Sequence, residues 1–275
     1  MSLRLLQAGY HVQVWNRSIN KTKLPVAQGA KLAKSAAALV EDSDVIMLCL
    51  TDTAAVEQVM FGEQGVAPFG ADDKVLVDFS SIAPDATQRF SERLQAISGM
   101  AWVDAPVSGG VSGAETGELV IMAGGDQATI NGIRPLLGAL SQRVTHMGPV
   151  GSGQATKVCN QMIVSCNVMV MAEVLALAEK TGVDATKIPA ALKGGFADST
   201  PLQLTGTRMA EKDFNDIKWH VKTLLKDLDL SSDLAAAHAA ETPMAALART
   251  LMKQHRDNGF ADKDPSTLIQ LYLQD

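Results

Sequence analysis

Residues 45–50 read Val-Ile-Met-Leu-Cys-Leu, a continuous apolar run bounded by Asp44 and Thr51. A short apolar run without polar alternation is typical of a strand that is covered on both faces, as in a parallel sheet. Residues 75–78 form a second short apolar strand, and an amphipathic helical pattern over residues 84–97 follows it. These stretches predict a buried sheet with helices packed on its faces.

The same alternation of strand and helix extends to both sides of this stretch. Further strands are expected over residues 11–15, 102–103 and 119–123, and further helices over residues 1–7, 21–29, 36–41 and 54–61. Repeated strand–helix units with short apolar strands predict a parallel sheet of the Rossmann type.

The second half of the chain has a different pattern. Strand signals largely stop after Gly148-Pro149, and residues 151–181 form one long helical pattern that ends at Gly182. More helices are expected over residues 184–193, 201–212, 217–240, 243–258 and 265–273. We therefore predict two domains, a Rossmann-like domain over residues 1–149 and an all-helical domain over residues 150–275, joined by the long helix.

Composition limits the class of protein. The chain has 275 residues, is 47% hydrophobic and 20% charged, and carries a net charge of −6, which argues against a broad nucleic-acid surface. Residues 162–178 are strongly apolar but include Ser165, Asn167 and Glu173, so we interpret them as a buried helix, not a membrane span. The three cysteines have no metal-ligand spacing, and we expect buried thiols in a cytoplasmic protein.

The N-terminus departs from a complete dinucleotide-binding unit. Such a unit has a strand and a G-x-G-x-x-G turn before its first helix, whose N-terminus binds the pyrophosphate. Here Met1 already lies in that helix, and Gly109-Gly110 and Gly124-Gly125 lack the spacing. We expect a sheet that lacks its first strand. Two explanations stay open: a chain that begins late, which we favour, and a variant with another element in that position.

Residues 14–18, Val-Trp-Asn-Arg-Ser, lie at the end of the strand that would hold the cofactor ribose. An acidic residue at this point binds the 2′-hydroxyl of NAD, whereas an Arg accommodates the 2′-phosphate of NADP. This stretch supplies the guanidinium of Arg17 and the polar side chains of Asn16 and Ser18, and it contains no carboxylate. This pattern favours NADP, with NAD possible; by itself it would also suit a solvated turn.

Two further stretches carry candidate chemistry. In the loop over residues 104–110, Ser108 with the backbone of Gly109 and Gly110 can hold a carboxylate, although an isolated Ser-Gly-Gly is more often an ordinary turn. At the start of the long helix, Lys157 can donate a proton to a carbonyl oxygen that receives a hydride. Gln161 lies four residues on, on the same helix face, and Asn160 adds a second polar group.

Four motifs in order resemble the β-hydroxyacid dehydrogenase family, which includes 3-hydroxyisobutyrate dehydrogenase, tartronate semialdehyde reductase and glyoxylate/succinic semialdehyde reductase. They are DFSSIAP (78–84), DAPVSGGVSGAETGELVIMAGG (104–125), GSGQATKVCNQ (151–161) and LLKDLDL (224–230). The resemblance covers almost the whole chain and is specific for the family, not for a substrate. GGFADST (194–200) is similar to tartronate semialdehyde reductases, whereas VWNRS (14–18) is similar to NADP-using glyoxylate/succinic semialdehyde reductases.

The resemblance implies a role for each matching residue. Lys157 would be catalytic, and the Ser108-Gly109-Gly110 turn would bind the substrate carboxylate with Asn160 and Gln161 nearby. The residues implied to line the cofactor are Cys49, Leu50, Ser81 and Lys226; by spacing alone, Lys226 would be an exposed helix residue. No metal site is expected.

The function implied is hydride transfer between NADP(H) and a short β-hydroxyacid or its semialdehyde. The apolar long helix predicts a homodimer or homotetramer. We expect a small carboxylate as the substrate, and we expect neither nucleic acid nor membrane as a partner. One alternative is a truncated, non-catalytic dimeric relative that does not bind dinucleotide. A second is an imine reductase-like enzyme, but such relatives usually lack the catalytic lysine.

Overall fold

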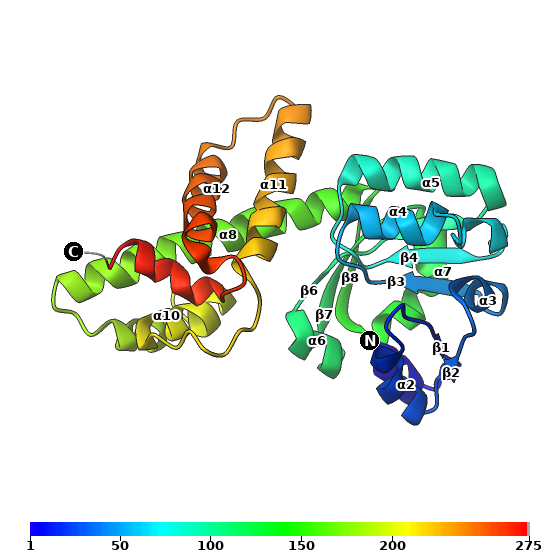
Figure 1. Cartoon of the computed structure of the whole chain (residues 1–275), viewed down its shortest axis with the longest axis horizontal. Coiled ribbons are helices and arrows are strands. Elements are labelled where there is room, and N and C mark those ends of the chain that lie inside the picture. The colour runs from blue at the N-terminus through cyan, green and yellow to red at the C-terminus, as the bar shows by residue number, and fades with distance from the viewer. Residues whose placement is uncertain (274–275) are drawn as a thin grey trace. The chain divides into compact units, whose positions relative to one another are not determined.

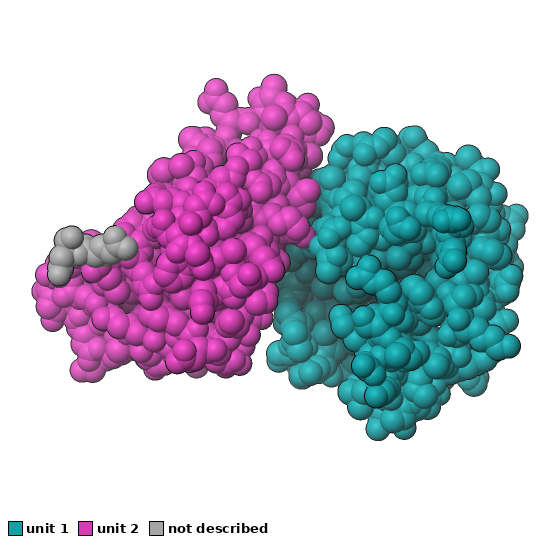
Figure 2. Space-filling model, viewed as in Figure 1, with its two compact units in different colours: residues 1–157 teal, residues 158–275 magenta. Residues whose placement is uncertain are grey.

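The computed structural model describes residues 1–273 and contains two compact units, residues 1–157 and residues 158–275. Figure 2 shows the two units in different colours. The division falls inside helix α8 (Ser152–Lys180), somewhat later along the chain than the boundary predicted at residue 149.

Unit 1 is built on a six-stranded sheet in the order β3-β4-β5-β7-β6, with β8 paired to β7 (Figure 1). The strands are β3 (Val45–Leu48), β4 (Val75–Asp78), β5 (Ala101–Asp104), β6 (Val107–Ser108), β7 (Leu119–Gly124) and β8 (Ser141–Gly148). The pairs β3–β4, β4–β5 and β7–β8 are parallel, whereas β5–β7 and β6–β7 are antiparallel. The predicted Rossmann-type sheet is confirmed as a sheet dominated by parallel pairs.

Helices cover both faces of this sheet. Helices α3 (Ala36–Glu41), α4 (Thr53–Phe61) and α5 (Pro84–Ser98) contribute to a core with Ile46 of β3 and Leu76 of β4. Helices α1 (Ser2–Gln7) and α7 (Gln127–Gly138) contribute to a second core with Val77 of β4 and Val103 of β5. Successive β4 residues therefore face opposite cores, as expected of a strand covered on both sides. Two shorter helical segments, η2 (Ala67–Phe69) and α6 (Gly110–Thr116), lie in the connections between strands.

The N-terminal strands form a separate two-stranded parallel sheet of β1 (Gln13–Val14) and β2 (Lys31–Leu32), connected by η1 (Ile19–Thr22) and α2 (Lys23–Ala27). No strand among residues 1–273 joins this small sheet to β3. The sequence prediction of a sheet without its first strand is thus matched by a break between β1 and β3. Strand β2 was not predicted, because both of its residues are exposed and give no apolar signal.

All the regular elements among the described residues of unit 2 are helices, as predicted. The unit contains most of α8, followed by η3 (Ala185–Lys187), α9 (Ile188–Leu192), η4 (Leu202–Gly206), α10 (Thr207–Glu211), α11 (Val221–Ala237), α12 (Pro243–His255), η5 (Arg256–Phe260) and η6 (Pro265–Leu271). One face of α8 enters a core with Leu224 and Leu228 of α11 and Met252 of α12. This packing of apolar helix faces stabilises the unit.

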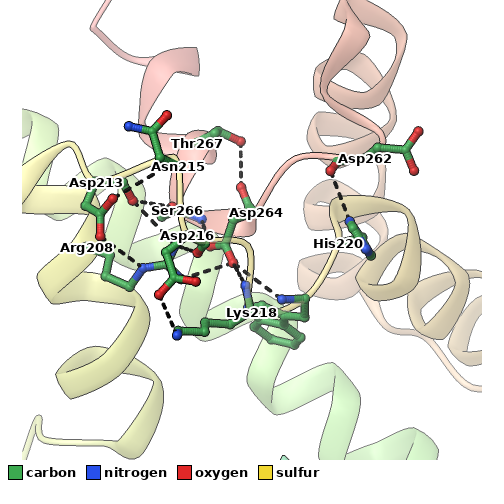
Figure 3. Close-up of polar contacts among 11 residues, drawn as sticks. Arg208, Asp213, Asn215, Asp216, Lys218, His220, Asp262, Asp264, Ser266 and Thr267 are labelled. Carbon is green, nitrogen blue, oxygen red and sulfur yellow. Dashed lines mark hydrogen bonds and ion pairs between the residues drawn. The ribbon is translucent and has the colours of Figure 1, made fainter. Parts of the chain in front are cut away.

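A buried ionic cluster organises the C-terminal part of unit 2 (Figure 3). The fully buried Asp264 pairs with Arg208 at 3.0 Å and accepts N–H bonds from Lys218 and Ser266, each at 2.9 Å. Burial alone would raise the pKa of Asp264, but these N–H donors and the guanidinium outweigh it, so its pKa lies below the ordinary value. Its contribution to stability is present above the ordinary carboxyl pKa and is lost as pH falls through the lowered value.

The cysteines depart from the prediction. Cys49 and Cys159 are exposed, and Cys166 is half-buried; none forms a disulfide. The expectation of buried thiols was therefore wrong for two of them. Cys49 follows directly on β3, and Cys159 lies on an outer face of α8, so an apolar sequence neighbourhood did not mean burial at either position.

Candidate functional site

The carboxyl ends of β3 and β4 are joined by Ser80. Its N–H donates to Asp78 Oδ1 at 2.9 Å, and its Oγ accepts from the N–H of Leu50 at 2.9 Å. The half-buried Ser81 follows in the same loop, and Cys49 precedes Leu50 at the end of β3. The structure thus brings three predicted cofactor residues, Cys49, Leu50 and Ser81, to one edge of the sheet.

The first turn of α8 is fixed to the same edge by Asp104 and Gln154. The N–H groups of Gly151 and Gln154 donate to the two carboxylate oxygens of Asp104, each at 2.8 Å. The buried Gln154 side chain accepts from Ile82 N–H at 3.2 Å and donates to the Ser80 carbonyl at 2.8 Å. A network of buried hydrogen bonds therefore connects the ends of β4 and β5 to the start of α8.

Two of these carboxyl groups have altered acidity. Burial raises the pKa of Asp78 to about 6, although the Ser80 hydrogen bonds lower it in part. Burial also raises the pKa of Asp104, against the N–H donors at the start of α8. Among residues 1–273, Asp78 Oδ2 is buried without a hydrogen-bond partner, which suits a carboxyl that takes up a proton readily.

Lys157 lies in α8, three residues after Gln154, which corresponds to a rise of about 4.5 Å along the helix axis. The residue is half-buried. Since the first turn is anchored to the carboxyl ends of β4 and β5, Lys157 lies near the sheet edge where ligands bind in open α/β folds.

The predicted carboxylate-binding turn lies between β6 and α6. Ser108 ends β6 and is half-buried, whereas the exposed Gly109 and Gly110 have φ values of 127° and 63°. A side chain would strain both positions, because L-residues rarely adopt such φ values. The sequence predicted a loop here, and the short elements on either side of the glycines were missed.

The turn after β1 has the features predicted for a phosphate site. Asn16, Arg17 and Ser18 are all exposed, and Asn16 Oδ1 accepts from the N–H of Ser18 at 2.8 Å. No acidic residue occurs from Trp15 through Thr22. The turn is therefore ordered by its own hydrogen bond and leaves the guanidinium in a positively charged setting, which fits a 2′-phosphate.

In unit 2, a chain of polar contacts connects α8 and α11. Asn160 donates to Gln161 Oε1 at 2.8 Å, and Gln161 donates to Asp227 Oδ2 at 2.5 Å. Lys226 also pairs with Asp227, at 3.4 Å, and its side chain is 33% exposed. The structure thus brings three predicted residues, Asn160, Gln161 and Lys226, together around one buried carboxylate.

Sequence reasoning missed the residues that position the predicted ones, namely Asp78, Ser80, Asp104, Gln154 and Asp227. A signal existed for Asp227, because it lies three residues after Leu224 and one before Leu228 and so falls on the apolar face of α11. Gln154 gave no such signal, since its partners lie far away in the sequence. Among residues 1–273, no group of acidic, His and Cys side chains could hold a metal ion.

Two family models together cover nearly the whole chain. Residues 1–148 match the NAD binding domain of 6-phosphogluconate dehydrogenase, and residues 151–272 match the NAD-binding domain of NADP-dependent 3-hydroxyisobutyrate dehydrogenase. The first match starts at residue 1, so it gives no support to the expectation of a chain that begins late.

Individual proteins that are similar to this chain agree with the two family models. The chain is 37% identical to 2-hydroxy-3-oxopropionate reductase of Escherichia coli K12 over 270 residues, which is 98% of this chain and 91% of the relative. The structure of 3-hydroxyisobutyrate dehydrogenase from Salmonella typhimurium matches with a TM-score of 0.89 at 25% identity, over 98% of this chain and 94% of the other. Psf3 in complex with NADP+ and 2-OPP matches with a TM-score of 0.88 at 25% identity, over the same shares.

The start of α8 lies so close to the sheet that a methyl group added at Gly153 is expected to lower stability. A Cβ at Gly153 would overlap the Met122 carbonyl oxygen and lie 2.7 Å from Asp104 Oδ2. We expect Gly153→Ala to lower the free energy of unfolding of unit 1 by about 1–3 kcal/mol, as overpacking typically does. Urea unfolding of the purified chain measures this change.

Gly132→Ala is the matched control, because a Cβ at this position in α7 meets nothing within 4 Å. This change should raise stability by up to about 1 kcal/mol, the difference in helix propensity between the two residues. Equal effects of the two substitutions would show that the α8 start is not held against β5 and β7 as described.

Proposed function

The chain belongs to the 3-hydroxyisobutyrate dehydrogenase family of NAD(P)-dependent β-hydroxyacid dehydrogenases, and we propose that it transfers a hydride between NADP(H) and a short β-hydroxyacid or its semialdehyde. The observation that carries this proposal is the half-buried Lys157, close in sequence to a helix turn that Asp104 and Gln154 anchor to the sheet edge. The substrate class is supported by the 37% identity to 2-hydroxy-3-oxopropionate reductase.

The proposed chemistry requires a proton donor and an anchor for the carboxylate. In the reductive direction, Lys157 gives a proton from its ammonium group to the carbonyl oxygen, which becomes the hydroxyl of the product. NADPH, when bound, supplies the hydride that the carbonyl carbon accepts. Lys157 is left neutral and regains its proton from solvent, so one turnover consumes one hydride and one proton.

The substrate carboxylate is proposed to bind at Ser108, Gly109 and Gly110. The Ser108 hydroxyl and the backbone N–H groups of two glycines are hydrogen-bond donors suited to an anion. Binding the carboxylate at one end of a short substrate would fix the distance of its carbonyl from the proton donor. Such positioning accounts for a large part of the rate gain in many enzymes.

For the cofactor, we propose that Arg17 binds the 2′-phosphate of NADP, together with Asn16 and Ser18. A guanidinium forms paired hydrogen bonds with phosphate, and no carboxylate in this turn would repel it. The similar structure of Psf3 contains NADP+, which supports this preference.

We also propose a homo-oligomer that buries an apolar stripe on α8. Ile163, Val170, Val174 and Leu177 share one face of the helix over about 21 Å and are 66%, 46%, 45% and 64% exposed. A second copy of α8 would cover this face symmetrically, because a two-fold interface uses the same residues from both chains. By length and composition alone α8 could also cross a membrane, but 44% of its apolar window is buried inside the protein.

Lys157→Ala should lower kcat for semialdehyde reduction by about 10²- to 10⁴-fold, the usual contribution of a general acid. Lys180→Ala is the matched control, because Lys180 is an exposed lysine in the last turn of the same helix. Steady-state kinetics with NADPH and short semialdehydes measure both variants. Turnover that survives Lys157→Ala, or turnover of a cyclic imine in place of the semialdehydes, would contradict the mechanism.

Arg17→Asp should lower the preference for NADPH over NADH by about 10- to 100-fold, because hydrogen bonds to a charged group are replaced by repulsion. The ratio of kcat/KM values for the two cofactors measures this preference. Lys21→Asp makes the same charge change in an exposed residue of η1 and should leave the ratio nearly unchanged. A wild-type chain that binds neither dinucleotide would instead favour a non-catalytic relative.

Leu177→Glu should shift the purified chain towards monomers, because two carboxylates would be buried near each other in the proposed interface. Light scattering coupled to size-exclusion chromatography measures the mass. Lys180→Glu, which changes the charge of the same helix beyond the stripe, should keep the oligomer. A wild-type chain that is monomeric, or that sediments with liposomes, would refute this assembly.

A further inference from the structure

Helix α11 contributes to the candidate site, and its first turn is held by backbone groups from near the C-terminus. Among the described residues, no side chain caps the start of this helix. Instead, the N–H of Val221 donates to the Lys263 carbonyl at 2.9 Å, and the N–H of Lys222 donates to the Ala261 carbonyl at 3.0 Å. The first turn of a helix leaves N–H groups without intrahelical partners, and these two carbonyls satisfy two of them.

The carboxylate of Asp264 holds the segment that leads into α11. Its Oδ2 accepts from the N–H groups of Lys218 at 2.9 Å and of Trp219 at 3.4 Å (Figure 3). Its Oδ1 accepts from the N–H of Ser266 at 2.9 Å and so caps the start of η6. One oxygen thus holds the approach to α11 and the other holds η6. We call residues 261–264 the C-terminal clamp.

The guanidinium of Arg208 connects the C-terminal clamp to α10. Its Nη1 pairs with Asp264 Oδ2 at 3.0 Å, and the two side chains are 13% and 0% exposed. Arg208 also donates to the backbone carbonyl of Asp216, in the segment before α11. A buried carboxylate is stable only when it is paired and hydrogen-bonded, so the loss of any of these donors would displace the clamp or its partners.

The position of α11 determines where Asp227 meets α8. Asp227 follows Val221 by six residues, which corresponds to about 9 Å along the helix axis. The Asp227 side chain is buried, accepts from Gln161 of α8 at 2.5 Å and pairs with Lys226 at 3.4 Å. Gln161 lies one turn after Lys157 in α8. A shift of the start of α11 would therefore be transmitted to the contact between Asp227 and Gln161.

We propose that Asp264 is a positioning residue for the candidate site, because it holds the start of α11 where Asp227 can bind Gln161. Asp264 acts through Asp227 and not by contact with the reacting atoms. This inference rests on the proposed function, since it concerns the same site. Displacements of about 1 Å caused by distant changes can lower enzyme rates by up to about 10²-fold, so a misplaced α11 should lower activity measurably.

Asp264→Asn tests the positioning role with a side chain of the same shape. An amide has one acceptor oxygen, so it can cap η6 or hold the approach to α11 but not both. We expect kcat/KM for semialdehyde reduction with NADPH to fall by about 10- to 100-fold. Leu202→Ala is the control for lost stability, because it removes a buried side chain of η4 outside the clamp and should leave kcat/KM nearly unchanged. Thermal melting sets an assay temperature at which both variants are folded.

A double-mutant cycle with Asp227→Asn distinguishes positioning from a general loss of stability. If Asp264 acts through Asp227, Asp264→Asn should cause little further loss of kcat/KM in a chain that already carries Asp227→Asn. Independent losses that multiply in the double variant would overturn the proposal. A normal kcat/KM in either single variant would also overturn it, because one of the two residues would then have no part in the site.

Amide hydrogen exchange tests the C-terminal clamp without any enzyme activity. The N–H groups of Val221 and Lys222 should exchange at least about tenfold faster in Asp264→Asn than in the wild-type chain, because their carbonyl partners are no longer held in place. Leu202→Ala should leave their exchange unchanged, and equal protection in all three chains would overturn the proposal. A wild-type chain without semialdehyde turnover would refute the proposed function, and the exchange rates would still decide whether Asp264 holds α11.

Discussion

The carboxylate of Asp104 determines the geometry of the candidate site, because its two oxygens bind the N–H groups of Gly151 and Gln154 at the start of α8. A helix has unsatisfied N–H groups in its first turn, and a buried carboxylate satisfies two of them here. The same residue ends β5, so the first turn of α8 is held to the end of that strand. Glycines at 124 and 153 leave room for this contact, since a Cβ at either would lie within 3 Å of Asp104. The position of the half-buried Lys157, on the next turn of α8, therefore depends on this contact.

Local patterns predicted the elements that carry a strong apolar signal. The runs at β3 and β4 and the long pattern of α8 were recognised, because burial on both faces or along one helix face leaves a readable periodicity. Strand β8 was missed, since most of its residues are exposed or half-buried and no apolar run marks it. The antiparallel pairing of β7 was missed too, because pairing direction depends on contacts between distant segments.

For the candidate site, sequence motifs found the residues with reactive or charged side chains, and the structure added those that hold them. Asp227 connects Gln161 with Lys226, yet the sequence analysis gave it no role of its own within the LLKDLDL motif. Gln154 binds both Ile82 and Ser80, seventy or more positions away. Such residues act through long-range hydrogen bonds, and a single sequence carries no record of those pairs. Composition and spacing therefore describe what a site contains better than how it is held.

The break between β1 and β3 affects the whole N-terminal segment. In a sheet covered on both faces, a strand gains stability from neighbours on both edges, and among residues 1–273 β1 pairs with β2 alone. Three large apolar side chains of this segment, Trp15, Leu24 and Leu32, are 39%, 59% and 43% exposed. The turn with Arg17 follows directly on β1, so its position depends on how firmly that strand is held. Cofactor affinity and the stability of the small sheet are therefore expected to be linked, because the energy needed to order β1 reduces the energy available for binding.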